Sequence, residues 1–197
     1  MRVLLLSGGL ESSALAYSEK PDLCITINYG QPPAAGEIRS ARAICSELDL
    51  EHQAISVPAY SKFMETRPVE GSSLFWPLRN QLLVTLAGIQ VASFGRSELI
   101  LGLVADDIYG DCRAEFISGL NGVLDAQQAE LSVVAPAIGL STLQLLIKSG
   151  VPKELLSLTL SCHVADYACG RCAGCLKSKA VLRRYRRPPS LSLVVSK

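Results

Sequence analysis

A glycine-serine turn directly after the first apolar segment places the strongest constraint on how this chain can fold. Arg2 to Leu6 reads as a buried strand, and Ser7-Gly8-Gly9-Leu10-Glu11-Ser12-Ser13 follows it without a break. The two glycines permit positive φ and a close approach of the backbone to a ligand. The serines and the start of a helix at about Ser12 supply N–H and hydroxyl donors. We expect an oxyanion to bind there.

The same residues could form an ordinary turn, since Gly-Gly pairs are common between strands and helices. The preceding strand, the following helix and the three hydroxyls favour nucleotide binding over that reading. Neither the Gly-Lys-Ser/Thr of a Walker loop nor a G-x-G-x-x-G pattern is present. The segment instead resembles the pyrophosphate loop, Ser-Gly-Gly-x-Asp-Ser, of the adenine-nucleotide α-hydrolases, which split ATP into AMP and pyrophosphate. One position departs, because Glu11 stands where that family has Asp.

The size and composition predict one α/β domain with a full core and a small appendage. The chain has 197 residues, of which 49% are hydrophobic, and this length suits a single domain. No run approaches the roughly 18 apolar residues that cross a bilayer, and the opening apolar run is too short for a secretory signal. We therefore expect a cytoplasmic protein with no membrane partner.

The net charge of +1 provides no general attraction for nucleic acid. Positive charge gathers near the carboxyl end, at Arg183, Arg184, Arg186 and Arg187. Arginines at the end of a helix offset its dipole while they stay in solvent. We favour this interpretation over a polynucleotide site and do not expect a nucleic-acid partner.

Apolar segments of strand and helix period alternate along the chain. The expected strands cover residues 2–6, 23–27, 51–57, 98–104 and 131–134, and the expected helices follow from about residue 12 and over 37–48, 79–91, 111–128 and 141–148. This order predicts a doubly wound parallel sheet with its ligand site at the carboxyl ends of the strands. Residues 59–76 show no period and predict a loop or mobile flap. The apolar tail would be an edge strand, a dimer contact or a frayed end.

Four of the seven cysteines crowd into fourteen residues: Cys162, Cys169, Cys172 and Cys175. This spacing is typical of a tetrahedral zinc site whose four thiolates leave no open position, so the metal would be structural. An iron–sulfur cluster and a C-x-x-C redox pair remain alternatives, since the spacing excludes neither. Among the other candidates, His163 reads as a bystander, and Cys24 and Cys45 fall on apolar faces and read as core.

The phosphate loop and the four-cysteine knuckle occur together in the 7-cyano-7-deazaguanine synthases, which form a nitrile in the biosynthesis of the queuosine precursor. Several segments between them are similar to that family's motifs in the same order: Tyr29-Gly30-Gln31, Pro77-Leu78-Arg79-Asn80, Gly102 with Asp106-Asp107 and Tyr109, and Asp111-Cys112-Arg113-Ala114-Glu115-Phe116. The likeness runs from about residue 1 to 185. It implies an ATP-pyrophosphatase-like α/β domain over 1–158, a zinc knuckle and terminal helix over 159–185, and a tail over 186–197.

The resemblance implies an ATP-dependent C–N ligase. ATP would adenylate 7-carboxy-7-deazaguanine, ammonia would displace AMP to give an amide, and a second activation would allow dehydration to the nitrile. Mg²⁺ would offset the phosphate charges, and the enzyme would be a homodimer. The implied nucleotide-binding residues are Leu6, Ser7, Gly8, Gly9, Leu10, Glu11, Ser12, Ser13, Gly30 and Asn80, and the implied catalytic residues are Glu11, Arg79, Asp111 and Arg113. Read without the family, Asn80 could simply begin a helix, and Asp111 could be an N-cap with Arg113 exposed.

Three departures from the family pattern bear on activity. Glu11 is one methylene longer than Asp and could displace a bound magnesium. Pro32-Pro33 follows Gln31 where the family has a His, and Ser141-Thr142 stand where it tends to have a Lys. These departures favour an alternative in which the enzyme stops at the amide or joins the activated acid to another amine, including a protein. A degenerate nucleotide-binding subunit and a tRNA sulfur transferase are further alternatives, and the transferase would need a reactive cysteine.

Overall fold

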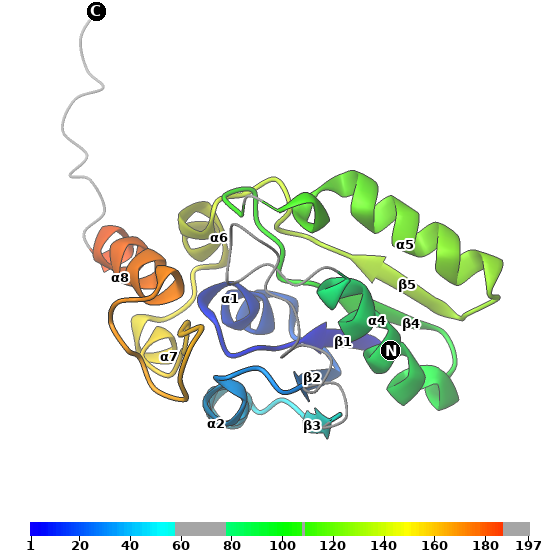
Figure 1. Cartoon of the computed structure of the whole chain (residues 1–197), viewed down its shortest axis with the longest axis horizontal. Helices are drawn as coiled ribbons and strands as arrows, with labels where there is room; N and C mark the ends of the chain where they lie inside the picture. The colour runs from blue at the N-terminus through cyan, green and yellow to red at the C-terminus, as the bar shows by residue number, and fades with distance from the viewer. Residues whose placement is uncertain (58–77, 108, 187–197) are drawn as a thin grey trace, which may run out of the picture.

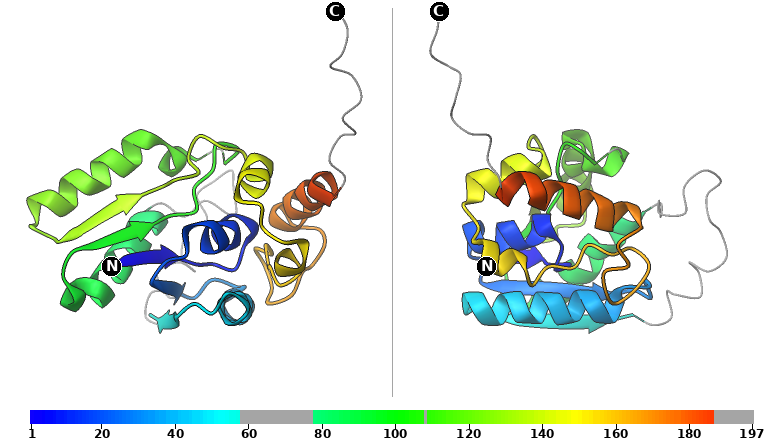
Figure 2. Two further views of the ribbon diagram at one scale, coloured as in Figure 1. Left: turned by 180° about the vertical axis from the view of Figure 1, so that it is seen from behind. Right: turned by 90° about the vertical axis from the view of Figure 1, so that its left-hand side faces the viewer.

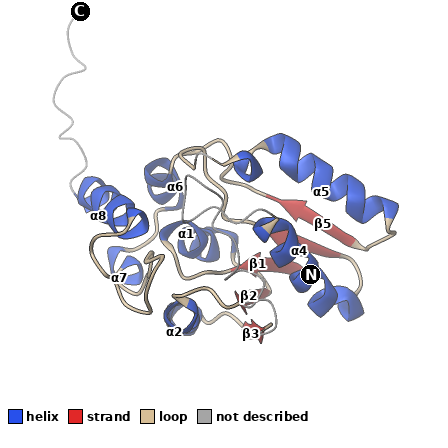
Figure 3. Cartoon of the chain, in the orientation of Figure 1, coloured by secondary structure: helices blue, strands red, loops and turns tan. Residues whose placement is uncertain are grey.

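The structure is a computed structural model, and it describes residues 1–57, 78–107 and 109–186. The flap expected over 59–76 and the apolar tail lie outside these residues. The described elements alternate between strand and helix along most of the chain (Figures 1 and 3). Their bounds are β1 Arg2–Leu5, α1 Leu10–Glu19, β2 Leu23–Asn28, α2 Ala34–Leu48, β3 His52–Ser56, α4 Arg79–Val91, η2 Ala92–Phe94, β4 Ser97–Ile100, η3 Gly110–Cys112, α5 Ala114–Ala126, β5 Leu131–Val134, α6 Thr142–Ser149, α7 Lys153–Leu156 and α8 Ala173–Arg186.

The five strands form one parallel sheet in the order β3-β2-β1-β4-β5. In the register, Leu4 of β1 lies between Cys24 of β2 and Ile100 of β4. The chain builds outward from β1 to β3 and then returns to the other side of β1. The order of connection therefore reverses between β1 and β4, and in such sheets a ligand site lies at the carboxyl ends of the strands at this point. The predicted doubly wound sheet is confirmed.

Two apolar layers cover the two faces of the sheet. Side chains of α1, α2, α6, α7 and α8 pack on one face in a cluster that includes Leu15, Ile44 and Leu146. Side chains of α4 and α5 pack on the other face in a cluster that includes Val84, Val91 and Leu120. Figure 2 shows the helices lying on both sides of the strands. The central strands β1, β2 and β4 are largely buried between these layers, whereas the edge strand β3 is partly exposed.

Several predicted boundaries were wrong by a few residues. The first helix begins at Leu10 rather than at about Ser12, and the fourth strand ends at Ile100 rather than at residue 104. Just beyond β4, Gly102 packs against the backbone of Ser12, where a Cβ would lie 3.3 Å from its nitrogen. The helix expected from Asp111 begins at Ala114, after the short helix η3.

Other local expectations are confirmed. The helix expected over 141–148 is α6, and the structure adds that Ser141 is its N-cap in a capping box with Gln144. Cys24 and Cys45 are fully buried. The arginines of the last described helical turn are solvent-exposed. In the described part of the chain, no helix combines the length and the apolar character that a membrane span requires.

Candidate functional site

A cavity of about 500 Å³ opens at the carboxyl ends of β1, β2 and β4, beside the phosphate loop. Its walls come from elements that are distant in the sequence, which the parallel sheet brings to one edge. Polar or ionisable side chains among its lining residues are Ser7, Glu11, Ser12, Thr26, Tyr29, Gln31, Glu37, Arg79, Asn80, Asp107, Tyr109, Cys112, Cys162 and His163. A cavity of this size with converging polar groups is typical of a small-molecule site.

The phosphate loop has the backbone geometry that its glycines predict. Gly8 has a φ of 74°, and Gly9 is the N-cap of α1. The Ser7 hydroxyl accepts a hydrogen bond from the Gly9 N–H at 3.3 Å and lies 3.2 Å from the Ser12 hydroxyl. The amino end of α1 and these hydroxyls therefore face the same region, which suits a negatively charged ligand.

The structure brings together only part of the expected nucleotide site. Leu6, Ser7, Glu11, Ser12 and Asn80 line the cavity. The remaining expected nucleotide-binding residues do not line it: Gly8 and Gly9 in the loop backbone, Leu10 and Ser13 in the core, and Gly30 at the surface. The Ser13 hydroxyl is already used, because it donates to the Gly9 carbonyl at 2.6 Å. Ser13 therefore stabilises the loop from the buried side, away from the cavity.

Of the implied catalytic residues, Glu11 and Arg79 line the cavity, but Asp111 and Arg113 do not. Asp111 accepts a hydrogen bond from the Asn80 amide at 2.8 Å, so it positions a side chain of the cavity wall. Arg113 is exposed and borders a separate hollow with Ile138. The N-cap of α5 is Arg113 and not Asp111, and its side chain makes no capping hydrogen bond.

Three carboxylates and one lysine form a cluster at the edge of the cavity. Lys177 Nζ lies 2.8 Å from Asp107 Oδ1, 3.2 Å from Glu11 Oε1 and 3.6 Å from Asp106 Oδ1. Burial opposes the charge on Lys177, but Glu11 and Asp107 outweigh this effect and raise its pKa. The lysine is therefore charged at neutral pH. It comes from α8, whereas the family lysine was expected near residues 141–142.

Glu37 is the second notable carboxyl group of the cavity. It lies in the first turn of α2, and its Oε2 accepts a hydrogen bond from Gln31 Nε2 at 2.8 Å. Burial raises the pKa of Glu37 to about 7, although the hydrogen bond from Gln31 and the charge of Arg79 lower it. The cavity therefore contains a carboxyl group that can exchange a proton near neutral pH.

Cys112 does not have the character of a reactive thiol. Burial, followed by the charges of Asp107 and Asp111, raises its pKa to about 12. A thiol with such a pKa stays protonated at neutral pH and is a poor nucleophile. This property argues against the sulfur-transfer alternative.

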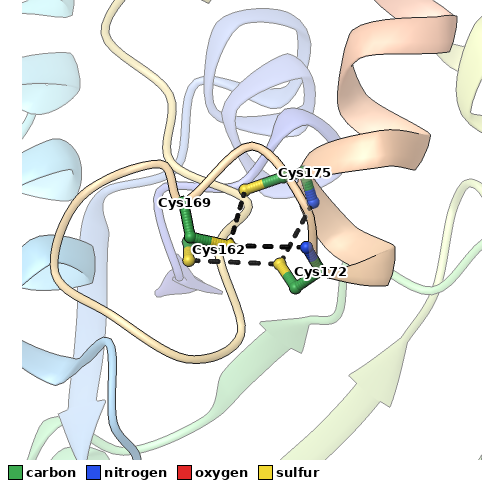
Figure 4. Close-up of side chains that lie close together, drawn as sticks. All are labelled: Cys162, Cys169, Cys172 and Cys175. Atoms are coloured by element: carbon green, nitrogen blue, oxygen red, sulfur yellow. Dashed lines mark hydrogen bonds between the residues drawn. The ribbon is translucent and has the colours of Figure 1, made fainter.

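The four clustered cysteines meet in one group beside the start of α8 (Figure 4). Their sulfur atoms all lie within 4.8 Å of one another, and two of the pairs, Cys169 with Cys175 and Cys162 with Cys172, are 4.0 Å apart. Sulfurs at about 2.3 Å from a tetrahedral zinc are separated by about 3.8 Å. The arrangement therefore fits one metal ion held by four thiolates.

Backbone N–H groups point at these sulfurs. The N–H of Cys172 lies 3.4 Å from the Cys169 sulfur, and the N–H of Cys175 lies 3.4 Å from the Cys172 sulfur. The N–H groups of Arg171 and Cys172 lower the pKa of the Cys169 thiol. Such hydrogen bonds stabilise thiolates, which are the metal-binding form. His163 is not part of the cluster and instead lines the cavity.

Sequence reasoning did not single out Lys177 or Glu37, and it named Asp106 and Asp107 only as part of a family motif. The two aspartates had a recognisable signal, because they follow a strand that ends at the site. Glu37 comes six residues after Gln31 of the Tyr29-Gly30-Gln31 motif, and its side chain is hydrogen-bonded to that glutamine. Lys177 had no signal in the sequence, since its position depends on how α8 packs.

The comparison with known families decides the assignment. The chain matches the family described as "Queuosine biosynthesis protein QueC" over residues 1–186. The chain belongs to the QueC family. It is 33% identical over 203 residues to a 7-cyano-7-deazaguanine synthase of Methanosphaerula palustris, covering 88% of this chain and 90% of the relative. It is 30% identical over 199 residues to that of Nitratiruptor sp., covering 88% and 89%. Both relatives carry the name of an enzyme, a synthase.

Solved structures show the same fold. A predicted subunit of tRNA methyltransferase from Methanocaldococcus jannaschii has a TM-score of 0.53 at 20% identity, covering 76% of each chain. The U34-tRNA thiolase NcsA from Methanococcus maripaludis, solved with its [4Fe-4S] cluster, has a TM-score of 0.52 at 16% identity, covering 94% of this QueC chain and 70% of its own. At these identities the likeness concerns the fold alone.

The cysteine cluster predicts one tightly bound zinc per chain. We expect Cys172→Ser to lose the metal and to lower the free energy of unfolding by about 4 kcal/mol or more, because metal binding contributes directly to folding. Elemental mass spectrometry and denaturant unfolding measure both effects. Cys112→Ser is the matched control and should keep its zinc. Iron with sulfide in the purified wild-type protein, in place of zinc, would contradict the prediction.

The raised pKa of Glu37 predicts a pH-dependent stability. The native state retains this proton up to about pH 7, whereas an unfolded glutamate loses it near 4.5. The stabilising contribution is therefore present below about pH 4.5 and is lost as the pH rises through 7. We expect Glu37→Gln to match the wild type near pH 4 and to exceed its free energy of unfolding by about 3 kcal/mol at pH 8. Exposed Glu115→Gln is the control; the same gain at both pH values for Glu37→Gln would contradict the assignment.

Proposed function

We propose that this protein converts 7-carboxy-7-deazaguanine to 7-cyano-7-deazaguanine with ATP and ammonia. The observation that carries the proposal is the phosphate loop opening into a cavity that also presents Arg79, Asn80 and Glu37. The QueC family membership supports the substrate class, since the relatives carry the name of this synthase. We place ATP at the loop and the carboxylic acid deeper in the same cavity.

In the first half-reaction, a carboxylate oxygen attacks the α-phosphorus of ATP. Pyrophosphate leaves, and an acyl adenylate forms. This activation is needed because oxide is not a leaving group, whereas AMP is. Ser7, Ser12 and the N–H groups at the start of α1 would hold the departing phosphates, and Arg79 would offset charge that develops on them.

Ammonia then attacks the acyl carbon and displaces AMP, which gives the amide and one proton. Glu37 is placed in the cavity wall with a pKa near 7, so it can accept that proton. A second ATP activates the amide oxygen in the same way. Loss of AMP and the remaining N–H protons gives the nitrile.

Two metals accompany this proposal. Mg²⁺ with ATP would neutralise phosphate charge, and the carboxylates of Glu11 and Asp107 are oxygen donors of the kind that Mg²⁺ prefers. Zn²⁺ would occupy the four-cysteine site, where a complete set of thiolates leaves no position for a substrate. The zinc would therefore stabilise the knuckle and take no part in the chemistry.

A second candidate is an enzyme that forms the same adenylate but passes it to another amine, such as a protein amine, or stops at the amide. One observation favours it. Pro32 and Pro33 line the cavity where the family pattern has a histidine, so this wall offers no imidazole to the second activation.

A single reaction distinguishes these functions. Purified protein is incubated with ATP, Mg²⁺, ammonium and 7-carboxy-7-deazaguanine, and the products are followed by mass spectrometry. We expect the nitrile, with two AMP formed for each nitrile. The amide alone, with one AMP, would support the second candidate, and a conjugate would do so in the presence of its acceptor. No AMP at all would contradict both and indicate a degenerate subunit.

A further inference from the structure

The acidic cluster creates an electrostatic problem for a site that binds phosphates. Glu11 lies in the first turn of α1, inside the phosphate loop, and Asp106 and Asp107 follow β4 at the neighbouring strand end. Glu11 and Asp107 both line the cavity. Three carboxylates beside a phosphate loop would repel a nucleotide that carries several negative charges.

Hydrogen bonds hold the carboxylates close together. The Thr142 hydroxyl lies 2.7 Å from Glu11 Oε1 and 3.2 Å from Asp106 Oδ1, and the Thr142 N–H donates to Asp106 at 3.1 Å. These groups come from the amino end of α6. They fix the positions of the carboxylates, but a neutral hydroxyl and an amide do not cancel their charge.

Lys177 supplies the positive charge that offsets these carboxylates. Its ammonium group is within ion-pair distance of all three carboxylates, and its closest contact is the 2.8 Å hydrogen bond to Asp107. About a third of its side chain is exposed, at 34%, and Glu11 is more buried, at 21%. An ion pair with such limited access to solvent is screened less than a pair on the surface.

Two sets of contacts fix the place from which Lys177 reaches the cluster. It lies two residues after Cys175, just past the first turn of α8, so the cysteine cluster holds the start of its helix. Gly174 packs against the Ser161 carbonyl and the His163 ring, with no room for a Cβ. Further along α8, the Tyr185 hydroxyl donates to the Val151 carbonyl at 2.7 Å. The lysine is therefore presented by a helix that is anchored at both ends.

We propose that Lys177 is a positioning residue of the nucleotide site: it offsets the charge of Glu11, Asp106 and Asp107 and so permits phosphates to bind at the adjacent loop. Lys177 does not line the cavity, so it acts through these carboxylates. This inference rests on the proposed binding of ATP. It gives α8 a second role beside its structural one, because this helix carries both Cys175 of the cysteine cluster and Lys177, which contacts Glu11.

The test compares Lys177→Met, Lys177→Arg and Lys179→Met with the wild type. Lys179 is an exposed residue of the same helix, so its replacement by Met changes the net charge equally and serves as the matched control. Zinc content and thermal unfolding show that each variant retains the knuckle. Two affinities are then measured by calorimetry: that of ATP without divalent cation, and that of Mn²⁺ alone, which reports on the uncompensated carboxylates.

The inference predicts opposite changes in the two affinities. Lys177→Met should bind ATP about tenfold more weakly and Mn²⁺ about tenfold more tightly, since a charged hydrogen-bonded partner has been removed. Lys177→Arg should restore most of both values, and Lys179→Met should match the wild type. A purely structural loss would weaken both ligands, and this result would overturn the inference.

The remaining outcomes separate this inference from the proposed function. Equal ATP affinities for the wild type and Lys177→Met would overturn the role of Lys177 and leave the proposed function standing. An unchanged Mn²⁺ affinity in Lys177→Met would also overturn it, whatever the ATP result. A wild-type protein that binds no ATP, with or without Mg²⁺, would overturn the proposed function and this inference with it.

Discussion

The close packing around Gly8 is the constraint on which the rest of the site depends. At a φ of 74°, Gly8 leaves no space for a side chain, because a Cβ would lie 2.6 Å from Ser40 Cβ on α2. Its carbonyl accepts a hydrogen bond from the Leu160 N–H at 2.8 Å, two residues before Cys162. The phosphate loop, α2 and the segment around Leu160 that leads into the cysteine knuckle therefore pack together as one unit.

This unit explains why the metal site and the cavity are neighbours. Gly36, near the start of α2, packs against Leu160 and Asp166, and its N–H donates to the Asp166 carboxylate at 2.9 Å. A metal bound by the four cysteines would therefore also support the walls of the cavity. Membership in the QueC family is consistent with this arrangement, since the family match includes both the loop and the knuckle.

The sequence predicted those features that depend on local pattern. The phosphate loop, the parallel strands and the four cysteines each have a short-range signal, whether turn chemistry, apolar period or ligand spacing. The site residues that it missed depend on distant contacts: Lys177 reaches Glu11 because α8 packs against α6, far from α1 in the sequence. The end of β4 was misjudged because Leu101, Leu103 and Val104 are buried although they lie beyond the strand. Asp111 was placed at the start of a helix, but it lies in η3 and accepts a hydrogen bond from the Asn80 amide.

The central claim is that the phosphate loop activates a carboxylate as an acyl adenylate. It is tested most directly with 7-carboxy-7-deazaguanine that carries ¹⁸O in both carboxylate oxygens, incubated with ATP, Mg²⁺ and ammonium. We expect one ¹⁸O atom in each AMP released by the first half-reaction, because the carboxylate oxygen becomes part of the phosphate that leaves. Unlabelled AMP, or label in inorganic phosphate together with ADP, would contradict the account.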